Sequence, residues 1–147
     1  MRLDPVEARQ RLRDSRVARL ATVAPDGAPH LVPICFVLVD DTIYSAVDSK
    51  PKTSPALQRF GNIAANPSVA ILADRYETDW DRLWWVRADG TGRRVDGSNE
   101  RAVAVAALRE KYAQYADHAL DGDVLAVDVS SWTGWAAVPD TSPAPGR

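Results

Sequence analysis

The chain lacks several features that would narrow its chemistry at once. A single cysteine, Cys35, among 147 residues excludes an internal disulfide and any cysteine-clustered zinc or iron–sulfur site. No run approaches the about 18 apolar residues of a membrane span, and no apolar signal segment follows Met1. We therefore expect a cytoplasmic protein that does not contact a membrane. The 18 Lys and Arg residues against 20 Asp and Glu give a net charge of −2, without the basic excess of a nucleic-acid-binding protein.

Common catalytic and cofactor motifs are also missing. There is no GxGxxG or GxxxxGK[ST] phosphate-binding loop and no GxSxG nucleophile elbow. His30 and His118 have no HxxxH or CxxC partner, so we expect no metal site. Cys35 lies in an apolar segment without a flanking base, and we expect it in the core or lining a pocket instead of acting as a nucleophile.

The apolar pattern predicts one mainly β (α+β) domain over residues 1–138. Expected strands are 17–23, 30–39, 42–47, 69–73, 83–86, 91–95 and 124–129. Expected helices are 5–14, a second from Pro55 to Asn66, and a third that Ser98 caps and that carries Tyr112 and Tyr115. Three strands precede the first crossover helix, which favours an antiparallel barrel with peripheral helices over a parallel βαβ series. Residues 139–147, rich in Pro, Ala and Ser, are expected to form a flexible tail.

Pro33 interrupts an otherwise favourable strand. Because proline cannot donate to the hydrogen-bond ladder, the strand lies at a sheet edge or is bulged there. Backbone groups left free at this point can contact a flat heterocycle. The alternative is that the strand is an ordinary sheet edge, protected from pairing with another strand, and binds no ligand.

The segment Ser49-Lys50-Pro51-Lys52-Thr53-Ser54 holds two of the three lysines. It leads into a helix whose first position is Pro55, so its ammonium and hydroxyl groups lie beside free backbone N–H groups. A bound anion would relieve the repulsion between these lysines and the helix dipole. The alternative interpretation is a solvated basic turn.

Tryptophans cluster at two places in the sequence. The first cluster is Trp80, Trp84 and Trp85, and the second is Trp132 and Trp135. On a strand, Trp84 and Trp85 point to opposite faces, so one packs in the core while the other is exposed. An exposed tryptophan is typical of an interface or a stacking wall, which favours a dimer.

Residues 18–23, 26–33 and 49–53, in this order, resemble the pyridoxamine 5′-phosphate oxidase-like split β-barrel superfamily. Residues 79–90 and 132–135 are similar to its actinobacterial branch of F420-dependent oxidoreductases. The resemblance extends over residues 16–138. It implies an FMN-binding-like antiparallel split β-barrel that forms a homodimer, with two cofactor sites between the subunits.

The cofactor implied by the resemblance is coenzyme F420, a deazaflavin with a phosphate and an oligoglutamate tail, and FMN is the alternative. The positions matched along the ring are Pro33, Ile34, Cys35 and Phe36. Those matched around the phosphate are Lys50, Lys52 and Thr53, with Ser49 beside them. Trp85 is a further candidate, and Trp132 of the partner subunit would close the site.

The predicted function is an F420-dependent oxidoreductase that transfers a hydride between the deazaflavin and a small organic acceptor, such as an enone or imine. Two alternatives are an FMN-dependent oxidase or reductase of the pyridoxamine 5′-phosphate oxidase type, and an F420-binding protein without turnover. No residue stands out as catalytic, and the proton is expected from solvent or from Tyr44.

Lys52 allows a direct test of the anion-binding interpretation. A charge-assisted hydrogen bond contributes about 1.5–3 kcal/mol, so Lys52→Ala should weaken F420 binding roughly 10- to 150-fold while the fold stays intact. Lys111→Ala, on the third expected helix, is the reference and should leave binding unchanged. Quenching of the cofactor fluorescence measures both affinities, and equal binding by the two variants would contradict the interpretation.

Overall fold

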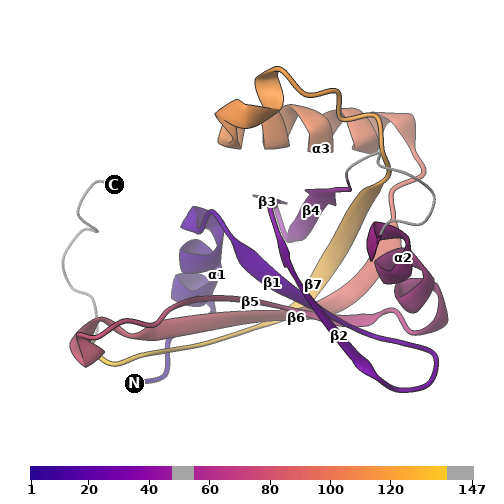
Figure 1. The fold of residues 1–147 in the computed structure, drawn as a ribbon. Coiled ribbons are helices and arrows are strands. Elements are labelled where there is room, and N and C mark those ends of the chain that lie inside the picture. Colours follow the sequence, from indigo (N-terminus) through magenta and orange to yellow (C-terminus); the bar gives the residue numbers. More distant parts are fainter. Residues whose placement is uncertain (48–54, 139–147) are drawn as a thin grey trace.

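Seven strands form one curled antiparallel sheet in the computed structural model, which describes residues 1–47 and 55–138 (Figure 1). The sheet order is β2-β1-β5-β6-β7-β4-β3, and every pairing is antiparallel. The strands are β1 (Ala18–Val23), β2 (Pro29–Ile34), β3 (Val37–Val39), β4 (Thr42–Ala46), β5 (Ser68–Arg75), β6 (Trp84–Arg94) and β7 (Val124–Ala136). This curled half-barrel with peripheral helices confirms the predicted fold class. Ser49, Lys50, Lys52, Thr53 and the predicted tail over 139–147 lie outside the described residues.

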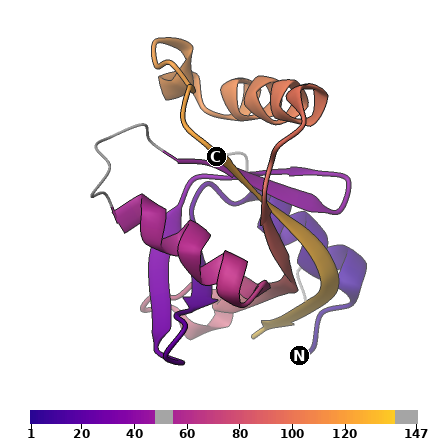
Figure 2. The ribbon, with the colours of Figure 1, turned by 90° about the vertical axis from the view of Figure 1, so that its right-hand side faces the viewer.

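The helices are α1 (Pro5–Asp14), α2 (Pro55–Ala65) and α3 (Ser98–Lys111), with short 3₁₀ turns at η1 (Trp80–Arg82) and η2 (Ala113–Ala116). Asp4 caps α1 by accepting the Glu7 N–H at 2.8 Å, with Pro5 in the first turn. The expected cap at Ser98 is wrong by one position, because Gly97 holds the cap and makes no side-chain bond. Figure 2 shows α2 lying across one side of the curled sheet, with α3 apart from it at one end.

The predicted single strand over 30–39 is wrong, since the chain breaks into β2 and β3 at Cys35 and Phe36. Pro33 lies on β2, an edge strand of the sheet, as the missing N–H requires. Phe36 is fully buried, whereas Cys35 is exposed, so of its two expected positions, the core or the lining of a pocket, the core is wrong. The break lets Phe36 turn into the core from the edge.

Tyr112 explains how the chain tolerates this break. Its hydroxyl accepts the Phe36 N–H at 3.0 Å and lies 2.6 Å from the Arg16 carbonyl oxygen, to which it can donate. Tyr112 directly follows the last residue of α3. Its two hydrogen bonds tie the end of α3 to the β2–β3 junction and to the segment just before β1. A backbone group that would otherwise be buried without a partner is satisfied in this way.

Lys111 takes part in the packing of the fold, which its choice as the reference position did not anticipate. Its ammonium donates to the Ser15 carbonyl oxygen at 2.6 Å and lies 3.8 Å from the centre of the Phe36 ring. Burial, with a smaller contribution from Arg16, lowers the pKa of Lys111 to about 8. Lys111→Ala is therefore not a neutral reference, and Arg13→Ala, at an exposed position of α1, replaces it for the binding test.

The two strands expected over 83–86 and 91–95 are one long strand, β6, with a bulge at Asp89 and Gly90. A Cβ at position 90 would collide with the Asp128 carbonyl oxygen of β7, so glycine is required where the two strands approach. The neighbouring strand β7 likewise runs through Trp132 and Trp135, beyond the expected end at residue 129. The sequence signal for a turn at Asp89-Gly90 marks a bulge inside a strand.

The described residues form two hydrophobic clusters. The larger cluster lies between the sheet, α1 and α2 and includes Phe36, Leu20 and Ile71. The smaller one, which includes Tyr44 and Val124, lies under α3. The strand β7 contributes to both clusters, and β6 pairs with it, so these two strands join the two parts of the fold.

A polar network holds α3 on the sheet. Arg93 of β6 donates to Glu100 of α3 and to Asp128 of β7, each at 2.7 Å. The Tyr44 hydroxyl donates to Glu100 at 2.7 Å, and Thr42 donates to Asp128 at 3.1 Å. The hydrogen bonds from Arg93, and then from Tyr44, lower the pKa of Glu100 to about 2.

Tyr112→Phe should lower the free energy of unfolding by about 1–3 kcal/mol, because the buried Phe36 N–H loses its acceptor. Urea unfolding followed by far-ultraviolet circular dichroism measures the change. Tyr76→Phe, which removes a hydroxyl from an exposed ring, is the matched control and should have little effect. Equal stability of the two variants would show that the Tyr112 bond contributes nothing.

The Glu100 network makes stability depend on acid pH. A carboxyl whose folded pKa lies near 2 and whose ordinary value is 4.5 favours the folded state above pH 4.5. This contribution should be lost as the pH falls from about 4.5 to 2. Urea midpoints across that range should fall more steeply for the native chain than for Glu100→Gln. Glu110→Gln, at an exposed position of the same helix, should follow the native curve. Parallel curves for the native chain and both variants would contradict the assignment of the acid-dependent stability to Glu100.

Candidate functional site

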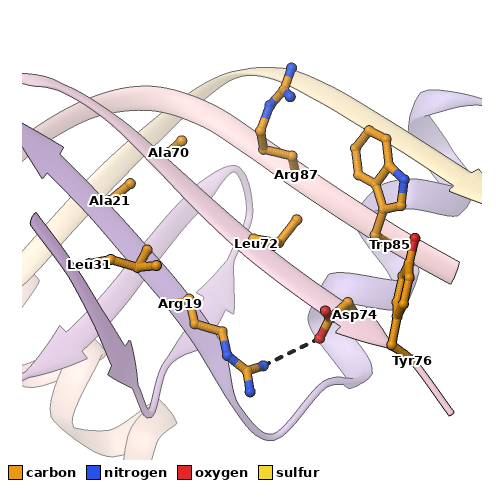
Figure 3. Close-up of a pocket in the computed structure, with 9 residues that line it drawn as sticks. All are labelled: Arg19, Ala21, Leu31, Ala70, Leu72, Asp74, Tyr76, Trp85 and Arg87. Carbon is orange, nitrogen blue, oxygen red and sulfur yellow. Dashed lines mark hydrogen bonds and ion pairs between the residues drawn. The ribbon is translucent and has the colours of Figure 1, made fainter. Parts of the chain in front are cut away.

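The sheet face that points away from the main core carries a hollow, which we call the outer groove. Side chains alternate along β1 and β5, so Leu20 and Ile71 are buried while their neighbours face outward. The outer groove is lined by Arg19, Ala21, Leu31, Ala70, Leu72, Asp74, Tyr76, Trp85 and Arg87 (Figure 3). Its volume of about 490 Å³ falls in the range of roughly 300–1,000 Å³ that is typical of small-molecule sites.

The floor of the outer groove consists of small and apolar side chains. Ala21 and Ala70 lie directly opposite each other across the β1–β5 pair, and small side chains at both positions leave space above the sheet. Leu72 completes the floor, while the rings of Trp85 and Tyr76 stand together at one end (Figure 3). A flat apolar floor beside aromatic rings suits a planar conjugated ligand.

Two arginines stand on either side of Leu72, because the register places Arg19 and Arg87 on the strands that flank it. Arg19 Nη1 lies 3.4 Å from Asp74, and Arg87 Nε lies 3.0 Å from Asp89. The Arg87 guanidinium also lies 5.9 Å from the centre of the Trp85 ring. Within the described part of the chain, each ion pair uses one guanidinium nitrogen, so further N–H groups can bind an anionic ligand group.

The structure brings one of the predicted cofactor residues, Trp85, into this groove. Trp84 packs against the main core, which confirms that the two neighbouring rings point to opposite faces. Trp132 also packs against that core, opposite Ala88 in the β6–β7 register. It therefore lies on the inner face of its own chain.

The predicted ring-binding run from Pro33 to Phe36 divides by orientation. Ile34 and Phe36 point into the core, whereas Pro33 and Cys35 are exposed at the sheet edge. None of the four lines the outer groove, although Pro33 lies directly opposite Arg19 in the β1–β2 register. Any ligand contact of Ile34 or Phe36 is thus limited to their backbone atoms.

Most lining residues of the outer groove were not singled out from the sequence. Arg19, Leu72, Tyr76 and Arg87 belong to ordinary alternating segments, whose outward positions could have been recognised from their period of two. What that period does not provide is the strand order. Only the placement of β5 between β1 and β6 makes these side chains neighbours.

A second basic feature lies at the start of α2, the helix that follows the predicted anion-binding segment. The first turn of α2 contains no acidic residue, and Arg59 lies one turn into the helix. Its Nε is buried without a hydrogen-bond partner in the described part of the chain, and burial lowers the pKa of Arg59. The described residues thus supply no acceptor to this nitrogen.

Tyr44 lies away from the outer groove, in the cluster under α3. Its hydroxyl donates to Glu100, and burial followed by that bond raises the pKa of Tyr44 to about 12. These surroundings make it a structural group of the polar network. The structure thus places the expected proton donor outside the groove.

Other kinds of site are not found in the described residues. Within residues 1–47 and 55–138, no group of three or more His, Cys, Asp or Glu side chains is arranged to hold a metal ion. No described helix is both long and apolar enough to span a bilayer.

Comparison with known proteins agrees with this architecture. Rv2991, a conserved hypothetical protein of Mycobacterium tuberculosis, has a TM-score of 0.75 at 21% identity, with 97% of this chain and 93% of that chain covered. An FAD-binding protein of Mesorhizobium loti has a TM-score of 0.70 at 21% identity, with 91% and 95% covered. HutZ, the heme storage protein of Vibrio cholerae, has a TM-score of 0.66 at 20% identity, with 92% and 95% covered.

These structures share the fold at low sequence identity, and no curated protein matches the sequence significantly. The profile of the pyridoxamine 5′-phosphate oxidase family, in contrast, matches residues 5–136, which is nearly the whole chain. With its curled antiparallel sheet and outer groove, the chain therefore belongs to the pyridoxamine 5′-phosphate oxidase family.

Proposed function

We propose that this protein is an F420-dependent oxidoreductase that reduces a small organic acceptor. The observation that carries the proposal is the outer groove, in which a flat apolar floor, an aromatic wall and two arginines lie together. This combination fits a planar ring system with anionic groups, and a deazaflavin has both. The preference for F420 over FMN rests on the resemblance of residues 79–90 and 132–135 to F420-dependent enzymes.

Each part of the groove would have a separate role. Ala21, Ala70 and Leu72 would support the ring, and Trp85 would shield its edge from water. Arg19 would bind an anionic group of the ligand. When bound, a reduced deazaflavin supplies a hydride to an electrophilic carbon of the acceptor, and the accompanying proton comes from solvent.

The phosphate is expected near the start of α2. Arg59, with a buried Nε that lacks a partner, supports an anion-binding role for this region. Lys50, Lys52 and Thr53, which precede the helix in sequence, would complete the set. Arg59 is an addition to the residues that the sequence had indicated.

A homodimer is part of the proposal. The outer groove has a floor and side walls but is open above the sheet, and Leu31 on its edge strand is 67% exposed. A second copy placed over this face would cover that apolar surface and close the groove. A stable interface hides about 1,200–2,000 Å² in total, so sedimentation should give a dimer at micromolar concentration. A stable monomer would exclude the closed site.

Two alternatives keep the same groove. FMN is also planar and carries a phosphate, and a protein that binds F420 without turnover would need the same floor and walls. The structural neighbours include an FAD-binding protein and a heme storage protein, which shows how widely ligands vary on this fold.

A groove-filling variant tests the proposal. Ala70→Trp should block the floor and weaken F420 binding by at least roughly tenfold, with little effect on stability because the position faces outward. Ser68→Trp is the matched control, since Ser68 lies on the same strand and face but outside the lining set. Titrations of the purified chain with F420, FMN and FAD, followed by cofactor fluorescence, give the affinities.

Turnover then separates the alternatives. Tighter binding of F420 than of FMN, with reduction of an enone or imine by the F420-loaded protein, would support the proposal. Tighter binding of FMN would favour the flavin alternative, and F420 binding without reduction of any acceptor would favour a carrier. Binding that Ala70→Trp and Ser68→Trp leave equally strong would exclude the outer groove as the cofactor site.

A further inference from the structure

A second hollow, which we call the side hollow, adjoins the outer groove. It is lined by Tyr76, Glu77, Thr78, Trp80 and Leu83, and has a volume of about 610 Å³. Tyr76 lines both hollows and so marks the boundary between them. The side hollow therefore lies next to the candidate cofactor site.

The loop that forms the side hollow is well ordered by its own contacts. Glu77 accepts from Arg75 at 2.9 Å and lies 3.6 Å from Arg82, so it connects both sides of the loop. Asp79 accepts the Asp81 N–H at 3.1 Å and caps η1. The Leu83 carbonyl oxygen accepts from the N–H of residue 137 at 2.9 Å. These bonds fix the loop before any ligand arrives.

This fixed loop nevertheless leaves two large rings in solvent. Trp80 is 76% exposed and Tyr76 is 64% exposed. Although both rings line the side hollow, no ring contact joins them within the described residues. A planar group can therefore stack on either ring without first separating a stacked pair, which keeps the reorganisation cost of binding low.

The charges of the side hollow indicate the chemistry of its ligand. Glu77 is the only charged residue among those lining it, and its carboxylate is already paired with Arg75 and Arg82. An anionic ligand group would meet this carboxylate without an unpaired cation to bind. An uncharged aromatic group, in contrast, could stack on Trp80 or Tyr76.

We propose that the side hollow is the acceptor subsite, and that it binds an uncharged aromatic substituent of the substrate against Trp80 and Tyr76. This inference rests on the proposed function, which places the cofactor ring in the outer groove on the other side of Tyr76. The reacting carbon of the acceptor would then lie near that boundary, while the aromatic substituent extends away from the cofactor. Trp80 and Tyr76 would act as specificity-determining residues.

Two enones that differ only in one substituent test the subsite. 4-Phenyl-3-buten-2-one carries a phenyl group where 3-penten-2-one carries a methyl group, and the reacting enone is the same. Trp80→Ala should raise the KM of the phenyl enone roughly tenfold, which corresponds to about 1.4 kcal/mol, and leave that of the methyl enone unchanged. Tyr76→Ala should act in the same direction, and Trp80→Phe should recover part of the loss.

Val103→Ala is the control, because it removes an exposed apolar side chain from α3, away from both hollows. Calorimetric titration of the cofactor-free and F420-loaded chains with the phenyl enone gives a second readout that needs no turnover. Affinity for F420 should be the same in Trp80→Ala and in the native chain. Sedimentation of both should give the same oligomeric state.

The outcomes separate the two proposals. If the chain binds no F420 but binds the phenyl enone in a Trp80-dependent way, the proposed cofactor fails and the aromatic subsite stands. If F420 binds and Trp80→Ala changes both enones equally or neither, the subsite is overturned and the cofactor proposal stands. If Trp80→Ala instead dissociates a dimer, the side hollow is an interface between copies and the subsite is likewise overturned.

Discussion

The pairing of β6 with β7 is the constraint on which the rest of the structure depends. The two strands stay paired from Trp84 and Ala136 at one end to Arg94 and Leu125 at the other, and they pass both hydrophobic clusters. Paired strands coil along their length, and the bulge between Asp89 and Gly90 adds a local bend to this long ladder. The Asp128 carbonyl oxygen leaves no space for a Cβ at position 90, so a glycine there allows the two strands to stay paired through the bulge.

The two faces of the curled sheet differ in how they are packed. The inner face must be filled, and Leu20, Ile71 and Val86 pack there without exposure. The outer face of the same strands does not pack against the core. Small residues such as Ala21 and Ala70 can therefore form the floor of a groove there. A groove that takes a flat ligand is thus a consequence of strand alternation on a sheet whose other face is already occupied.

The polar contacts outside the groove maintain this arrangement. Tyr112 satisfies the backbone where the edge of the sheet breaks, and Arg93 ties α3 to β6 and β7 through two carboxylates. Neither group reaches the outer groove, so the residues that stabilise the fold are separate from those that would bind a ligand. The loop with Trp80 follows the same principle, because its ion pairs with Glu77 fix the backbone and leave the rings available.

The sequence by itself determined the class of fold and the position of most elements. Turn residues, capping signals and apolar periodicity depend on neighbours along the chain. They correctly predicted antiparallel pairing and the opposite faces of Trp84 and Trp85, and of the two positions expected for Pro33, an edge or a bulge, the structure shows the edge. Tertiary contacts decided the rest. The hydroxyl of Tyr112, just after α3, satisfies the backbone where the strand breaks at Phe36, and a carbonyl on β7 converted the Asp89-Gly90 signal from a turn into a bulge. Packing against Phe36 half-buries Lys111. The outer groove is the clearest case: Arg19 and Arg87 are far apart in sequence, and only the strand β5 between them makes them two walls of one site.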